Sequence, residues 1–153
     1  VGAMLISFVA LVALVNGCLG GVTPWINYFF GTAIQSLSLD TIFAWLFSPF
    51  AYLLGFTGIE MAKVGELIGT KVAINEFVAY LKLIAMDLSP RTASLATYAL
   101  CGFSNFSCIG IQVGGIGALV PEKRKWLTEL GLTAVLGGTL SNLLTAMVAG
   151  LFI

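Results

Sequence analysis

Residues 69–83 read GTKVAINEFVAYLKL and place a carboxylate, Glu76, in the middle of an apolar run. Charged side chains are rare inside such runs, and where they occur they normally face a cavity or a partner. Asn75, directly before it, can cap a helix that begins there, and the positive end of that helix would stabilise the carboxylate. The stretch therefore predicts two short helical arms that meet at Asn75 and Glu76.

The composition places the chain in a lipid bilayer. Of its 153 residues 59% are hydrophobic and 9% are charged, and the mean hydropathy is +1.03, whereas soluble domains are about 45–50% apolar and about 25% charged. Seven basic residues balance seven acidic ones, so no positive field attracts nucleic acid and we expect no nucleic-acid partner.

The chemistry-bearing residues do not indicate an enzyme. The chain has three cysteines and no histidine, and the cysteines form no CxxC pair, so neither a disulfide framework nor a metal site is predicted. No candidate nucleophile has a base beside it, which leaves catalysis unsupported. We expect a protein that is not an enzyme and carries no cofactor.

The hydropathy pattern predicts an all-α membrane protein with three membrane-spanning helices, one of them discontinuous, plus an interfacial helix and a re-entrant helical hairpin. Asp40 is the expected cap of the interfacial helix, Ser48-Pro49 should break or kink it, and residues 23–38 are expected to be a surface connection. The chain opens in mid-run, and we interpret it as the C-terminal part of a longer protein. The predicted parts are a scaffold-like spanning helix over 1–22, the interfacial helix over 38–57, the hairpin over 58–87, the discontinuous spanning helix over 92–120 and a C-terminal spanning helix over 127–153.

The discontinuous helix is predicted from CGFSNFSC, residues 101–108, at the centre of an otherwise apolar segment. Serine and asparagine compete for backbone hydrogen bonds and favour local unwinding. Broken helices in transporters put helix ends and free backbone groups at the bilayer midplane, where substrates bind. Together with the hairpin, this predicts a binding site around Glu76 and Asn105, with Phe103 and Phe106 as an apolar wall.

A structural interpretation fits the same residues about equally well. Glu76 can pair with Lys71 or Lys82 and only fix the geometry of the hairpin. Asn105 and its polar neighbours can hold helices together, as polar residues commonly do in membrane bundles. The alternative to a transporter is therefore a structural or oligomerisation module of the membrane that binds no ligand.

The distribution of basic residues predicts the orientation. The loop PEKRK, residues 121–125, carries three basic residues in a row and should be cytoplasmic by the positive-inside rule. The protein would then be a multi-pass protein of the plasma (inner) membrane with Ile153 outside, and the hairpin would enter from the external side.

Three stretches of the chain closely resemble the C-terminal half of the concentrative nucleoside transporters: GTKVAINEFVAYL, YALCGFSNFSCIGIQVGG and GTLSNLLTAMVAGLF. The resemblance covers nearly the whole chain. It implies a nucleoside symporter driven by sodium or by protons, which forms a homotrimer together with its N-terminal half. It also implies that the first span is a scaffold helix at the trimer centre, and that the coupling Na⁺ or H⁺ is held mostly by residues upstream.

The same resemblance implies roles for individual residues. Glu76 would accept hydrogen bonds from the ribose hydroxyls, Asn105 would bind the same sugar, and Phe103 would pack against the nucleoside. Cys108 stands where the family often has serine, and because a thiol is a weaker donor and acceptor than a hydroxyl, its contact with the sugar should be weaker. Asn75 completes the expected substrate site.

Overall fold

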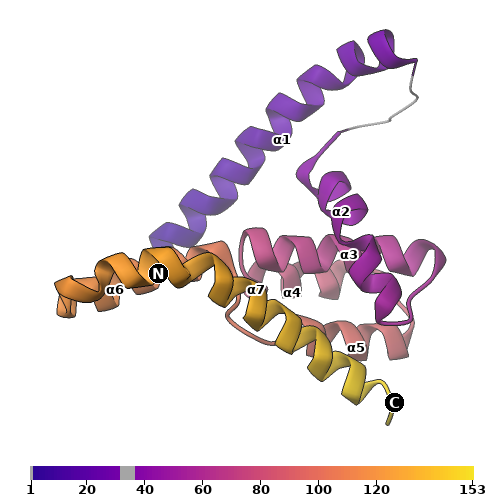
Figure 1. The fold of residues 1–153 in the computed structure, drawn as a ribbon. Coiled ribbons are helices and arrows are strands. Elements are labelled where there is room, and N and C mark those ends of the chain that lie inside the picture. The colour runs from indigo at the N-terminus through magenta and orange to yellow at the C-terminus, as the bar shows by residue number, and fades with distance from the viewer. Residues whose placement is uncertain (1, 32–36) are drawn as a thin grey trace.

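The computed structural model describes residues 2–31 and 37–153, and all the regular structure in these two ranges is helical (Figure 1). This confirms the prediction of an all-α protein for the described part of the chain. The elements are α1 (Gly2–Phe30), α2 (Leu39–Leu53), α3 (Gly58–Ala73), α4 (Glu76–Ala85), α5 (Pro90–Leu100), α6 (Phe106–Leu119), the 3₁₀ turn η1 (Pro121–Lys123) and α7 (Arg124–Ala149).

Two helical stretches are long and apolar enough to cross a membrane, Ala10–Phe29 and Pro121–Ala149. A third span is possible if α2 and α3, which are bent by 111° at their junction, count as one broken element. We expected a discontinuous third span over 92–120, and the structure divides that region into α5 and α6, of 11 and 14 residues. Each is shorter than the ~20 residues that a straight span needs.

The first helix extends further than predicted. The surface connection expected over 23–38 is wrong for its beginning, because α1 continues through Thr23 and Pro24 to Phe30; residues 32–36 lie outside the described part of the chain. The Thr23 hydroxyl donates to the Leu19 carbonyl at 2.9 Å and accepts from the Leu37 backbone N–H at 3.0 Å. This hydroxyl, one residue before Pro24, thereby connects α1 to the residues that lead into α2.

The start of α2 also differs from the prediction. Ser38 is the N-cap, and its hydroxyl accepts from the Thr41 backbone N–H at 3.2 Å. Asp40 lies in the first turn, and its carboxylate binds the Lys82 ammonium of α4. The same ammonium contacts Glu66 of α3 at 3.0 Å, so one lysine connects α2, α3 and α4.

No break occurs at Ser48-Pro49. Helix α2 continues over Pro49 to Leu53, and the Ser48 hydroxyl donates to the Ala44 carbonyl of the preceding turn. Serine often bonds backward in this way inside helices, and a neighbouring hydroxyl helps a membrane helix to tolerate a proline. Of the two expected outcomes, a break or a kink, the break was therefore wrong.

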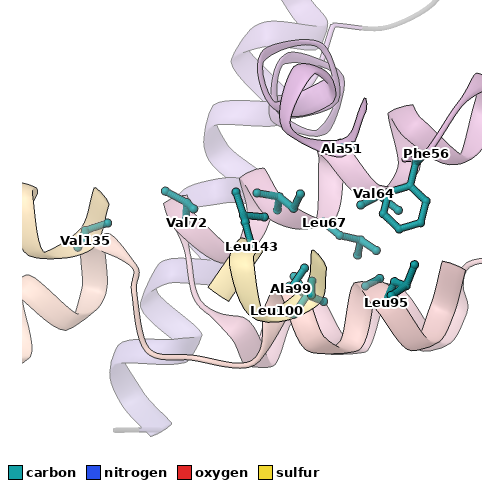
Figure 2. Packing of buried hydrophobic residues seen from close by; sticks show 14 residues of the cluster. Ala51, Phe56, Val64, Leu67, Val72, Leu95, Ala99, Leu100, Val135 and Leu143 are labelled. Atoms are coloured by element: carbon teal, nitrogen blue, oxygen red, sulfur yellow. The ribbon is translucent and has the colours of Figure 1, made fainter. Parts of the chain in front are cut away.

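Helix α3 lies at the centre of the fold, between α2 and the pair α4 and α5 (Figure 1). Gly65 allows α2 to approach, because a Cβ there would lie 2.9 Å from the Ala44 carbonyl oxygen. On its other side α3 shares a hydrophobic core with α5 and α7. Figure 2 shows this core, to which these helices contribute Val64, Leu67, Leu95, Leu100 and Leu143, all buried.

Candidate substrate site

Two interruptions of the helical structure meet in the folded chain. The first separates α3 from α4 at Ile74 and Asn75, and the second separates α5 from α6 over residues 101–105. The Asn105 amide nitrogen donates to a Glu76 carboxylate oxygen at 2.9 Å. The Ser107 hydroxyl donates to the Ile74 carbonyl, also at 2.9 Å. The first bond joins the start of α4 to the start of α6, and the second joins the end of α3 to the start of α6. Together, α3 and α4 are called the α3–α4 hairpin.

Each interruption ends in a capped helix. The Asn75 side-chain oxygen accepts from the Val78 backbone N–H, and the Asn105 side-chain oxygen accepts from the Cys108 backbone N–H, each at 2.9 Å. Both asparagines are buried. The predicted cap at Asn75 is thus confirmed, and Glu76 is the first residue of α4, where the positive end of the helix dipole favours a carboxylate.

Glu76 retains capacity to accept hydrogen bonds. Its side chain is half-buried, and Asn105 bonds to one of its two oxygens. Within the described residues no donor is bonded to the other oxygen, Oε1. An ionised carboxylate can accept about four hydrogen bonds, so this group can bind hydroxyl groups of a ligand.

Neither predicted lysine partner forms an ion pair with Glu76 in the described part of the chain. Lys82 binds Asp40 and Glu66. Lys71 is buried, and its ammonium donates to the Ser104 hydroxyl at 2.5 Å. The structural interpretation of Glu76 as one half of a salt bridge therefore has no support in this geometry.

Phe103 and Cys108 lie beside this pair rather than in it. They line a cavity of about 250 Å³ between α6 and α7, whereas Glu76 and Asn105 do not. The Phe103 side chain is 78% exposed, so its ring is available to a ligand. The cavity also contains polar side chains that the sequence analysis did not assign to a site, namely Ser104, Gln112 and Asn142.

Of these three residues, Asn142 was the one that the sequence could most readily have indicated, because it interrupts an apolar span on α7. Its amide nitrogen donates to the Ser104 hydroxyl at 2.9 Å. Gln112 lies one turn after Cys108 on α6, a spacing that puts both side chains on one helix face. Neither signal indicates a site by itself, because polar residues in membrane helices commonly serve only for packing.

The apolar helices, the two facing interruptions and the half-buried carboxylate are the arrangement of a membrane transport protein built from discontinuous helices. Comparison with protein families agrees. The family described as "Na+ dependent nucleoside transporter C-terminus" matches residues 1–150. The chain belongs to this family, and its apolar helices are those of a multi-pass membrane protein.

Curated relatives are transporters rather than enzymes. Nucleoside permease NupC of Helicobacter pylori is 43% identical, over 100% of this chain and 37% of its own length. Sodium/nucleoside cotransporter 1 of Rattus norvegicus is 36% identical, over 99% of this chain and 25% of its own. The chain thus spans little more than a third of its bacterial relative.

Solved structures share the fold. CNTnw in an inward-facing substrate-bound state has a TM-score of 0.86 and 44% identity, over 99% of this chain and 37% of that one. A CNTnw variant in an outward-facing state also has a TM-score of 0.86, with 43% identity, over 99% and 36%. This chain therefore resembles CNTnw about equally well in its inward-facing and outward-facing states.

Proposed function

We propose that this chain is the substrate-binding C-terminal half of a cation-coupled nucleoside symporter, and that it binds the ribose between the α3–α4 hairpin and the break between α5 and α6. The observation that carries the proposal is the Asn105–Glu76 hydrogen bond of 2.9 Å. It brings an acceptor from one interruption and a donor from the other to one point.

In the proposed site each group has a separate task. The free oxygen of Glu76 accepts from one ribose hydroxyl, and the Asn105 amide turns from Glu76 toward the sugar when the nucleoside enters. The exposed ring of Phe103 packs against the nucleoside, with Cys108 beside it. Asn75 acts through the backbone, because its side chain caps α4 and thereby fixes the position of Glu76.

The hairpin and the break are proposed to move together past a scaffold that includes α1. The bonds that join them support such a unit. In this scheme the hairpin is re-entrant, α2 lies at the membrane interface, the PEKRK loop is cytoplasmic and Ile153 lies outside. The protein works as a homotrimer.

The coupling ion is proposed to be sodium or a proton, bound mostly outside this chain. The family description names Na⁺. Among the described residues no group of three or more acidic, cysteine or histidine side chains is placed to hold a metal ion. In this proposal the residues of this chain serve the nucleoside, and the ion acts from the rest of the transporter.

Uridine should stabilise the intact protein in detergent. A ligand that binds only the folded state at 100 times its Kd adds about 2.7 kcal/mol to the free energy of unfolding, so the thermal midpoint should rise with uridine concentration. Uracil and 2′,3′-dideoxyuridine are the matched controls, and both should give much smaller shifts because they lack the ribose hydroxyl pair. No shift at saturating uridine would favour the structural or oligomerisation module.

Replacing Cys108 by serine should preserve or improve nucleoside binding. A hydroxyl in place of the thiol can add a hydrogen bond worth about 0.5–1.5 kcal/mol, a gain of up to roughly tenfold in affinity. Titration of the intact protein with uridine measures this, and Cys18→Ser on α1, where the thiol is exposed, should leave the affinity unchanged. A large loss for Cys108→Ser would show that the sulfur itself makes a required contact.

A further inference from the structure

Lys71 is the largest fully buried side chain in the described part of the chain, with 1% of its surface exposed. Lysine is almost never buried to this extent unless it is paired. Its ammonium has three protons to donate, yet among the described residues the Ser104 hydroxyl, at 2.5 Å, is its one hydrogen-bond acceptor. The proposed function assigns no task to this charge.

The surroundings of Lys71 connect it to the sugar site from two directions. Ser104 lies inside the break between α5 and α6, next to Asn105, and is itself buried. Lys71 lies on α3 and Glu76 on α4, so the ammonium and the carboxylate belong to the two arms of one hairpin, although they form no ion pair. The ammonium therefore contacts the break that carries the donor and has the charge opposite to that of the acceptor.

Ser104 is held from the opposite side as well. The amide of Asn142 and the hydroxyl of Thr139, both on α7, donate to its oxygen at 2.9 and 3.4 Å. The break is thus fixed between the hairpin and α7. If Lys71 were removed, Ser104 would still have donors, so the loss would not leave an unbonded buried hydroxyl.

We propose that Lys71 is a positioning residue for the sugar site, whose buried ammonium orients the α5–α6 break through Ser104 and offsets the negative charge of Glu76. Lys71 does not touch the substrate. This inference rests on the proposed nucleoside function and extends it to a residue outside the binding surface. A purely structural lysine would be expected to contribute to stability and leave ligand affinity unchanged.

The test separates these two roles by measuring stability and affinity on the same variant. Lys71→Met keeps the length and apolar stem of the side chain, and it removes the cost of burying an ammonium that has no ion-pair partner among the described residues. In the intact protein, uridine affinity should fall by about tenfold or more, while the thermal midpoint without uridine stays the same or rises. Lys125→Met, on an exposed side chain, should change neither quantity.

A double-variant comparison tests the connection through Ser104. If Lys71 acts through that hydroxyl, the losses of uridine affinity in Lys71→Met and Ser104→Ala should be clearly less than additive when combined. Additive losses would overturn the connection. If Lys71→Met does not fold, Lys71→Gln, which retains a donor without the charge, takes its place in both measurements.

Wild-type uridine affinity in the folded Lys71 variant, with or without a loss of stability, would overturn the inference. This outcome differs from failure of the proposed function. In that case the wild-type protein itself would show no response to uridine, and no comparison among variants could be made.

Discussion

Glu76→Gln in the intact protein should lower uridine affinity by about 100-fold, and labelled uridine uptake should fall steeply. Hydrogen bonds to a charged group are worth about 1.5–3 kcal/mol each, and 100-fold corresponds to about 2.8 kcal/mol. The change keeps the shape of the side chain, and a glutamine oxygen can still accept from Asn105. What it removes is the second acceptor oxygen and the charge, which are the features that would bind ribose hydroxyls.

Glu66→Gln is the matched control for this substitution. Glu66 lies on α3 of the same hairpin, and its carboxylate is bonded to Lys82 rather than to the proposed site. The control changes the charge of the hairpin by the same amount, and its uridine affinity should remain within a few-fold of the wild-type value. Near-normal affinity and uptake in Glu76→Gln would contradict the ribose-binding role, and equal losses in both variants would indicate a general effect on the hairpin.

The sequence analysis predicted features that depend on local chemistry. Asn75 stands where a helix begins, and an asparagine cap acts on backbone groups only three residues away, so its effect can be predicted from the neighbouring residues. The polar residues of CGFSNFSC likewise mark the break, since residues 101–105 of this stretch are not helical in the fold. The depth of these elements in a bilayer stays a prediction.

The errors concern residues whose role is decided by distant parts of the chain. Asp40 was expected to cap its own helix, but it binds Lys82, 42 positions away. The helix α1 continues past Pro24, and Thr23 there bonds to residue 37. The Ser104 contact of Lys71 depends in the same way on how α3 packs against the break, which no local pattern encodes.

Gly102→Ala should damage both folding and binding, because it strains the break from within. Gly102 has φ +151°, a conformation that residues with a Cβ rarely adopt, and a Cβ there would lie 2.5 Å from the Asn142 side-chain oxygen. Such strain typically costs about 1–3 kcal/mol. Moving Asn142 would also disturb its hydrogen bond to Ser104. We therefore expect a lower thermal midpoint. We also expect uridine affinity to fall by about tenfold or more, because the break that carries Asn105 would no longer be held in its orientation.

Gly110→Ala separates this effect from the general consequence of adding a methyl group. Gly110 lies within α6, and a Cβ there would meet no atom within 4 Å. Alanine is favoured over glycine in a helix by about 1 kcal/mol, so this variant should be as stable as the wild type or slightly more stable, with unchanged uridine affinity. If Gly102→Ala behaved like Gly110→Ala in both measurements, the backbone of the break would not be constrained, and the sugar site could not depend on its shape.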